Sequence, residues 1–111
     1  ELGSGSSTKT RRLIAAALAE YGALHYIPID VSPSILEASA AELVREFPGL
    51  RVTAYAADYR AALARLGTTV AGPKLVVFLG SSLGNDEAAD AARLLSEVRR
   101  VLKPGDRLLL G

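Results

Sequence analysis

The sequence opens with Glu1-Leu-Gly-Ser-Gly-Ser-Ser-Thr-Lys-Thr10, and this stretch decides the fold. Two closely spaced glycines followed by hydroxyl residues and a helical pattern predict a strand end, a tight turn and a helix start. Glycine lets the backbone approach a ligand closely, and the N–H groups at a helix N-terminus attract negative charge. The stretch therefore predicts a ligand-binding loop, the alternative being a glycine-rich turn that binds nothing.

The remainder of the chain alternates short apolar runs with helical stretches, the pattern of βαβ units and a parallel sheet. Strands are predicted at residues 24–31, 51–56, 74–79 and 107–110, and helices at residues 8–21, 32–47, 59–66 and 86–102. Pro28 removes one ladder hydrogen bond, so we expect the strand around it to be irregular or at an edge. The run 74–79 is apolar almost throughout, as in the buried centre of a parallel sheet.

Helix boundaries follow from a few residues. Gly22 predicts the end of the first helix. Ser32 is the expected cap of the second helix, with Pro33 at its first position. Asp86 is the expected cap of the last helix, which ends at the turn Lys103-Pro-Gly-Asp106. That turn is predicted to be structural.

Composition narrows the class of protein. The 111 residues suit one small domain, and half of them are hydrophobic with 5% aromatic, so the core is aliphatic. A formal charge of +1, with acids and bases intermixed, gives no basic footprint for nucleic acid or a membrane surface. With no cysteine and one histidine, we expect no metal site. No apolar run reaches the roughly 18 residues of a membrane span and no signal peptide opens the chain, so we expect a cytoplasmic protein.

Both ends of the sequence lie inside predicted strands. Glu1-Leu-Gly3 is typical of the last residues of a strand already under way, and residues 107–111 form a strand with nothing after it. We therefore expect residues 1–111 to be a partial domain, truncated at both ends, which lacks the start of its first strand and its C-terminal strands and substrate elements. We expect such a fragment to be inactive alone.

Polar residues at strand ends are candidates for binding, because ligands of doubly wound sheets bind beyond the carboxyl ends of the strands. Asp30 ends the second strand, where a carboxylate can accept hydrogen bonds from two ribose hydroxyls. The alternative is a helix cap, for which Ser32 is better placed. Asp58 and Tyr59 follow the third strand and could hold an adenine between an acceptor and a ring. The alternative is that Asp58 caps the short helix and Tyr59 packs on the surface.

The loop Gly80-Ser-Ser-Leu-Gly-Asn85 follows the most buried strand, where this fold presents its substrate. Its glycines, hydroxyls and amide suit a small polar molecule, and Asn85 offers both donors and an acceptor. The alternative is that Asn85 or Asp86 is the N-cap of the following helix.

The first loop also distinguishes between two nucleotide-like ligands. A dinucleotide fingerprint has a third glycine where this chain has Thr8, so the loop disfavours NAD. A carboxylate two residues before the first glycine, here Glu1, is typical of methyltransferases. It suits the ammonium of the methionine moiety of S-adenosylmethionine.

Four segments together resemble the histidine-specific N-alpha-methyltransferases, which trimethylate the amino group of histidine on the way to ergothioneine. They are residues 1–10, 27–32, 57–59 and 78–85, and the resemblance spans the whole chain. It implies an α/β fold, the Rossmann-like core of a class I methyltransferase with a mostly parallel sheet and flanking helices. It also implies S-adenosyl-L-methionine as the cofactor.

The motifs and the resemblance together imply a set of site residues. The cofactor-binding residues are Glu1, Gly3, Ser4, Gly5, Lys9, Asp30, Val31, Ala57, Asp58 and Tyr59. The substrate-binding residues are Gly80, Ser81 and Asn85. No residue is implied as a catalytic group or a metal ligand. Tyr59 stands where the family often has Phe, and Leu79 stands where a Pro often precedes the glycine.

The implied reaction is an in-line attack by an unprotonated amino group on the sulfonium methyl group, for which the protein holds donor and acceptor in line. The predicted acceptor is L-histidine, and we expect a monomer with no nucleic-acid or membrane partner. One alternative is a class I methyltransferase for another small amine, such as the prenylated tryptophan that fungal relatives methylate. The other is a non-catalytic S-adenosylmethionine-binding fragment.

Overall fold

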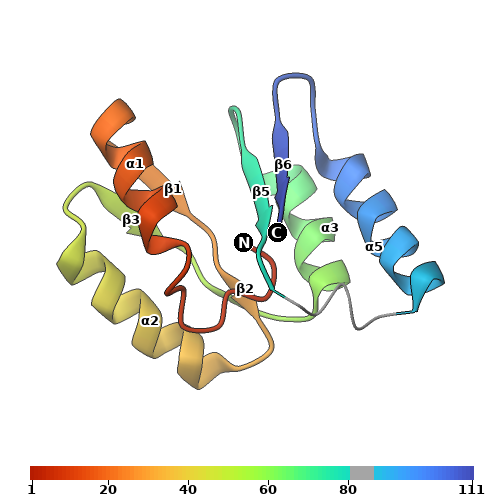
Figure 1. The fold of residues 1–111 in the computed structure, drawn as a ribbon, viewed down its shortest axis with the longest axis horizontal. Helices are drawn as coiled ribbons and strands as arrows, with labels where there is room; N and C mark the ends of the chain where they lie inside the picture. Colours follow the sequence, from red (N-terminus) through yellow and green to blue (C-terminus); the bar gives the residue numbers. More distant parts are fainter. Residues whose placement is uncertain (81–86) are drawn as a thin grey trace.

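The computed structural model describes residues 1–80 and 87–111 (Figure 1). In chain order its elements are α1 (Arg11–Tyr21), β1 (Leu24–Tyr26), β2 (Ile29–Asp30), α2 (Pro33–Glu46), β3 (Leu50–Val52), β4 (Tyr55–Ala56), α3 (Tyr59–Thr69), β5 (Leu75–Phe78), α5 (Ala88–Val101) and β6 (Arg107–Leu110). The predicted alternation of parallel strands and helices is confirmed.

The strands pair in parallel as β1 with β3, β2 with β4, and β5 with β6. Residues 1–4 join these pairs: Leu2 bridges Ile29 on one side, and its N–H donates to the Val77 carbonyl at 2.8 Å on the other. Across the sheet the order is therefore β3 with β4, then β1 with β2, then residues 1–4, then β5, and finally β6. This is the doubly wound order, in which ligands bind where the direction of winding reverses, here between residues 1–4 and β5.

Pro28 breaks the second strand as predicted, dividing it into β1 and β2. The neighbouring strand divides at the same level into β3 and β4. Backbone bonds bridge the gap, since Thr53 N–H donates to the Tyr26 carbonyl and Tyr55 N–H to the Pro28 carbonyl, each at 3.0 Å. The register therefore continues past the proline, which keeps Asp30 at the end of its strand.

Two helical layers cover the sheet. Figure 1 shows α1 beside α2, and α3 beside α5 on the other side of the strands. Arg11 ties the first pair through Glu42 and Glu46, at 3.1 and 2.9 Å. One buried cluster lies under α1 and α2 (Ile14, Tyr26, Leu43) and the other under α3 and α5 (Leu2, Ile29, Ala62, Leu63, Val76, Phe78, Leu94, Val98). Burial of each large apolar side chain is worth about 1.5–3 kcal/mol, so these clusters hold the strand ends in place.

Two helix bounds differ from the sequence predictions. α1 begins at Arg11, not at residue 8, because residues 5–10 form turns that include a left-handed Ser7 (φ +57°). α3 continues through Gly67 to Thr69, where the sequence predicts a loop after residue 66. A Cβ atom at Gly67 would lie 3.4 Å from Val101 of α5, so the glycine serves close helix packing instead of ending the helix.

The expected helix caps are confirmed in part. Gly22 ends α1 in a left-handed conformation (φ +75°), and Pro33 opens α2. Ser32 occupies the N-cap of α2 as predicted, although its side chain makes no capping hydrogen bond. Asp30 Oδ1 accepts the N–H of Ser32 itself at 3.1 Å. Asp86 lies outside the described residues, and Glu87 stands at the N-cap of α5.

A buried ion pair between Lys74 and Asp106 links the start of β5 to the start of β6, at the opposite end of the strands from the glycine loop. The Asp106 carboxylate accepts from Lys74 N–H at 2.9 Å, Lys103 N–H at 2.8 Å and Lys74 Nζ at 2.5 Å, and its side chain is 2% exposed. The Lys74 side-chain hydrogen bond, followed by the two backbone bonds, lowers the carboxyl pKa from 3.8 to about 2. The turn at residues 103–106 is therefore structural, as predicted.

Asp106→Asn is expected to lower the melting temperature of the full-length protein by a few degrees at pH 7. The folded carboxyl has the lower pKa, so its contribution is present above pH about 4 and is lost as the pH falls towards 2. Thermal unfolding between pH 2 and 7 should show a weaker acid dependence in the variant. The control is Asp90→Asn, whose exposed partner Arg93 lies at 3.6 Å and contributes little. Equal effects of the two variants would contradict the role of Asp106.

Candidate functional site

The loop of residues 3–10 lies at the carboxyl edge of the sheet, at the reversal of strand order. Gly3, Gly5 and Ser7 have φ of +65°, +50° and +57°. Ser4 N–H donates to the Ile29 carbonyl at 3.1 Å, and Ser7 N–H donates back to the Ser4 carbonyl at 2.9 Å. Left-handed residues let the chain turn sharply between the first strand and α1, and the predicted tight loop is confirmed.

Gly3 lies directly against Tyr59, the first residue of α3. A Cβ atom at Gly3 would be 2.7 Å from Tyr59 Oη, and the Tyr59 ring packs edge-on against Phe78 at 5.6 Å and 70°. Tyr59 follows β4 by three residues, and its side chain contacts the glycine loop at Gly3. By contrast, a Cβ atom at Gly5 would meet nothing within 4 Å, so the loop is open there.

Gly3→Ala is expected to destabilise the protein more than Gly5→Ala does. Both variants would carry the cost of a left-handed alanine, about 1 kcal/mol, but only the methyl group introduced by Gly3→Ala also collides with Tyr59. Tyr59→Phe removes Oη and leaves the nearest ring carbon at 3.6 Å. The double variant should therefore recover part of the loss, as a double-mutant cycle by chemical denaturation would measure. Strict additivity of the two substitutions would contradict the contact.

Asp30 connects the loop to the second strand. Its Oδ2 accepts the Gly5 N–H at 2.9 Å and its Oδ1 accepts the Ser32 N–H at 3.1 Å. Each carboxylate oxygen can accept a further hydrogen bond, so capacity remains for two ligand hydroxyls. The sequence predicts a carboxylate at this edge, and the structure adds that the same group holds the loop and the start of α2.

Asp58 and Tyr59 occupy the next strand end. Asp58 Oδ1 accepts the Ala61 N–H at 2.9 Å and so caps α3, while Tyr59 packs on Phe78. The capping alternative for Asp58 is therefore confirmed, whereas Tyr59 packs against the buried cluster and not on the surface. An open hollow of about 370 Å³ adjoins them, lined by Asp58, Tyr59, Arg60, Asp90 and Leu94. A ligand edge could reach the exposed Asp58 carboxylate from this side.

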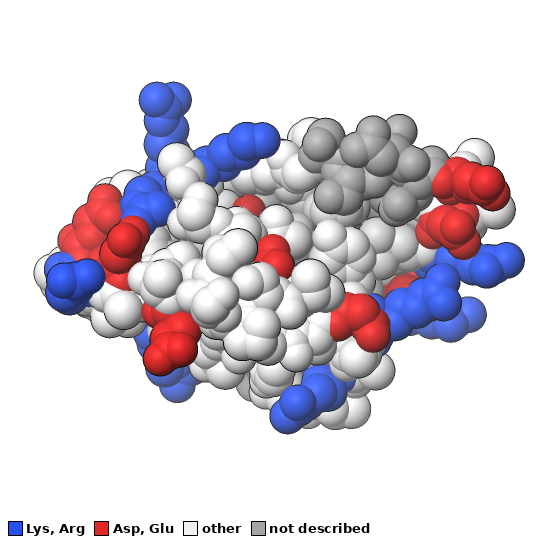
Figure 2. Space-filling model, turned by 90° about the horizontal axis from the view of Figure 1, so that it is seen from below, with Lys and Arg blue, Asp and Glu red and all other residues white. Residues whose placement is uncertain are grey.

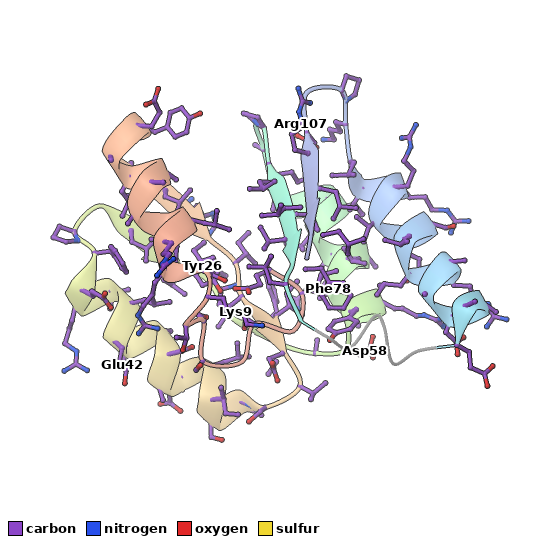
Figure 3. All side chains as sticks on the ribbon, in the orientation of Figure 1. Lys9, Tyr26, Glu42, Asp58, Phe78 and Arg107 are labelled. Atoms are coloured by element: carbon purple, nitrogen blue, oxygen red, sulfur yellow. The ribbon has the colours of Figure 1, made fainter. Side chains whose placement is uncertain are left out.

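Lys9 connects the loop to the end of β5. Its Nζ donates to the Leu79 carbonyl at 3.3 Å. Figure 3 shows Lys9, Phe78 and Asp58 towards the same end of the molecule, with Arg107 at the opposite end. Gly80, one of the predicted substrate-binding residues, follows directly. Ser81 and Asn85, the other two, lie outside the described residues.

A buried polar network under the loop was not predicted from the sequence. The Tyr26 hydroxyl of β1 donates to Glu1 Oε2 and lies 2.9 Å from Ser7 Oγ. Tyr26 is 7% exposed, and burial, followed by the bond to Glu1, raises the pKa of its phenol. Alternation along the strand could have shown that Tyr26 faces inward, but not which groups it meets.

Three further residues predicted to bind the cofactor differ in exposure: Val31, Ala57 and Ser4. Val31 is 72% exposed beyond Asp30, and Ala57 is half-buried at the end of the third strand. Ser4 Oγ is buried without a hydrogen-bond partner among the described residues. An exposed apolar side chain beside acidic groups suits a flat ring that carries polar substituents.

Charged side chains are few in the middle of the carboxyl edge on the face that Figure 2 shows. Figure 2 looks onto the carboxyl edge, whose middle is mostly uncharged with isolated carboxylates, while Lys and Arg gather towards the margins. Residues 1–80 and 87–111 hold no cluster of three or more His, Cys, Asp or Glu side chains placed to bind a metal ion. No helix in these ranges is long and apolar enough to cross a membrane.

Strand order and loop together define a doubly wound α/β fold, a class in which ligands bind at the switch point. The chain belongs to the family of histidine-specific, S-adenosylmethionine-dependent methyltransferases, which it matches over residues 1–111.

Individual relatives agree with the family assignment. The histidine N-alpha-methyltransferases of Mycolicibacterium smegmatis and Mycobacterium tuberculosis are 40% and 39% identical to this chain over all of its 111 residues. The ergothioneine biosynthesis protein 1 of Neurospora crassa is 31% identical over 113 residues, which are 13% of its length. The chain spans 34% of the length of each of the two bacterial proteins.

Proposed function

We propose that this chain forms the cofactor-binding part of a Rossmann-like class I methyltransferase, which methylates the α-amino group of L-histidine. The observation that carries the proposal is the loop at the switch point. It brings Glu1 and Asp30 to one edge of the sheet beside Gly3 and Gly5. Two carboxylates and a glycine turn suit a ligand that carries an ammonium and a ribose.

The residues at this edge fit S-adenosylmethionine part by part. Glu1 would meet the ammonium of the amino acid end, and the free acceptor capacity of Asp30 would meet the ribose hydroxyls. Val31 and Asp58 would flank and bond the adenine. Buried Ser4 Oγ and the open space beside Gly5 leave polar capacity and room in the loop itself.

The cofactor and the residues of the chain would have separate roles in the reaction. Bound S-adenosylmethionine supplies an electrophilic methyl group. The chain's own residues bind and orient, since holding two reactants in line removes much of the entropic barrier. We assign no general base to residues 1–80 and 87–111.

The amino acid acceptor would lie beyond the end of β5. Gly80 is placed there, and Ser81 and Asn85 follow it in the sequence. L-histidine as the acceptor is supported by the family description and by the names of the two bacterial relatives. Another small amine, such as a tryptophan derivative, is the alternative acceptor.

Asp30→Ala is expected to weaken S-adenosylhomocysteine binding by the full-length protein more than tenfold. The variant loses the proposed ribose acceptor and the anchor of the Gly5 N–H together. Isothermal titration calorimetry measures the affinity, and Glu20→Ala, an exposed carboxylate in the last turn of α1, is the matched control. Unchanged affinity in Asp30→Ala would refute the ribose assignment.

Turnover with isotopically labelled S-adenosylmethionine identifies the amino acid that accepts the methyl group. The full-length protein should methylate free L-histidine well above any other free amino acid, and each product should carry the label on the α-nitrogen. Mass spectrometry of the products locates the methyl groups. Turnover of tryptophan at or above the rate of histidine would favour the alternative acceptor.

A further inference from the structure

The strongest unassigned feature is the polar network beneath the loop, formed by Glu1, Ser7 and Tyr26. Tyr26 lies on the second strand, with its ring in the buried cluster beside Ile14 and Leu43. Its hydroxyl emerges from that cluster between two groups of the loop: it donates to Glu1 Oε2, and Ser7 Oγ lies 2.9 Å away. One side chain from a neighbouring strand thus contacts both ends of the turn.

The network constrains each of its members. Ser7 is 1% exposed and left-handed, so its hydroxyl has few partners besides Tyr26. A phenol hydroxyl with one proton donates to Glu1 and can accept from Ser7, which satisfies all three groups. A buried phenol without such partners would be costly, since unpaired buried polar groups destabilise a fold.

The bond to Tyr26 occupies one oxygen of Glu1 and orients the other. A carboxylate on a flexible side chain samples many rotamers, and a ligand that binds one of them must first restrict the rest. With Oε2 held by the phenol, the direction of Oε1 is set before a ligand arrives. The second contact of the Tyr26 hydroxyl, with Ser7 Oγ, holds the loop in the turn that leads into α1.

We propose that Tyr26 is a positioning residue for the amino acid end of the cofactor: with Ser7, it holds Glu1 so that the second carboxylate oxygen meets the ligand ammonium. This inference rests on the proposed function. It differs from a purely structural role in one respect. A structural contact would support every part of the site, whereas a positioning contact acts on the part of the ligand that Glu1 meets.

The test compares two ligands on the full-length protein by calorimetry. S-adenosylhomocysteine carries the amino acid end, and 5′-methylthioadenosine shares the adenosine but lacks that end. Tyr26→Phe keeps the ring and removes the hydroxyl, so it should weaken S-adenosylhomocysteine binding by about tenfold, as loss of a bond to a charged group does. Binding of 5′-methylthioadenosine should change by less than about twofold.

The matched control is Tyr55→Phe, on β4. Its ring lies 5.0 Å from the Arg65 guanidinium, away from the loop, and neither ligand should change in affinity. A second variant, Ser7→Gly, relieves the left-handed backbone and removes the hydroxyl. It should weaken S-adenosylhomocysteine alone, by about threefold, and it serves if Tyr26→Phe does not fold.

The outcomes separate the two proposals. Equal losses for both ligands, or no loss for either, would overturn the positioning role of Tyr26 and leave the proposed function standing. Failure of the unaltered protein to bind S-adenosylhomocysteine would overturn the proposed function, and the positioning role with it. Loss confined to S-adenosylhomocysteine in both network variants supports the inference.

Discussion

The backbone pairing of residues 1–4 is the constraint on which the rest of the structure depends. The Leu2 N–H donates to the Val77 carbonyl on one side. On the other side the Ile29 N–H donates to the Glu1 carbonyl, and the Ile29 carbonyl accepts the Ser4 N–H. Without this short stretch the pair β5–β6 would be separate from the other strands. Because it lies where the winding reverses, its loop stands at the position where doubly wound sheets bind ligands. The segment that completes the sheet therefore also begins the site.

The carboxylates of the proposed site are each held by a hydrogen bond within the fold. Asp30 accepts two backbone N–H groups, Asp58 caps α3, and Glu1 accepts the Tyr26 hydroxyl. A carboxylate has room for about four hydrogen bonds, so one that is held by the protein can still bind. Its orientation is then fixed in advance, which lowers the entropic cost of ligand binding. Substitution of these residues affects architecture and binding together, and so matched controls are needed.

The two hydrophobic layers explain why a loop rich in Gly and Ser has a defined geometry. Leu2 and Phe78 anchor its flanks in one layer, and Ile14 and Tyr26 do so in the other. Gly3 in turn accommodates Tyr59 at a distance that no side chain would allow. Loop geometry here is set by rigid elements on both sides, as is usual where a scaffold carries a binding site.

Local patterns in the sequence determined the alternation of strands and helices, the break at Pro28, the stop at Gly22 and the acidic residues at strand ends. These features depend on neighbouring residues, and so a single sequence contains them. Only the tertiary structure decided that α3 runs through Gly67, that Asp30 accepts the Gly5 N–H of the loop, and that Tyr26 meets Glu1 and Ser7. Each of these depends on strand register and helix packing between residues distant in the chain, because a parallel crossover brings together groups that local propensity does not relate.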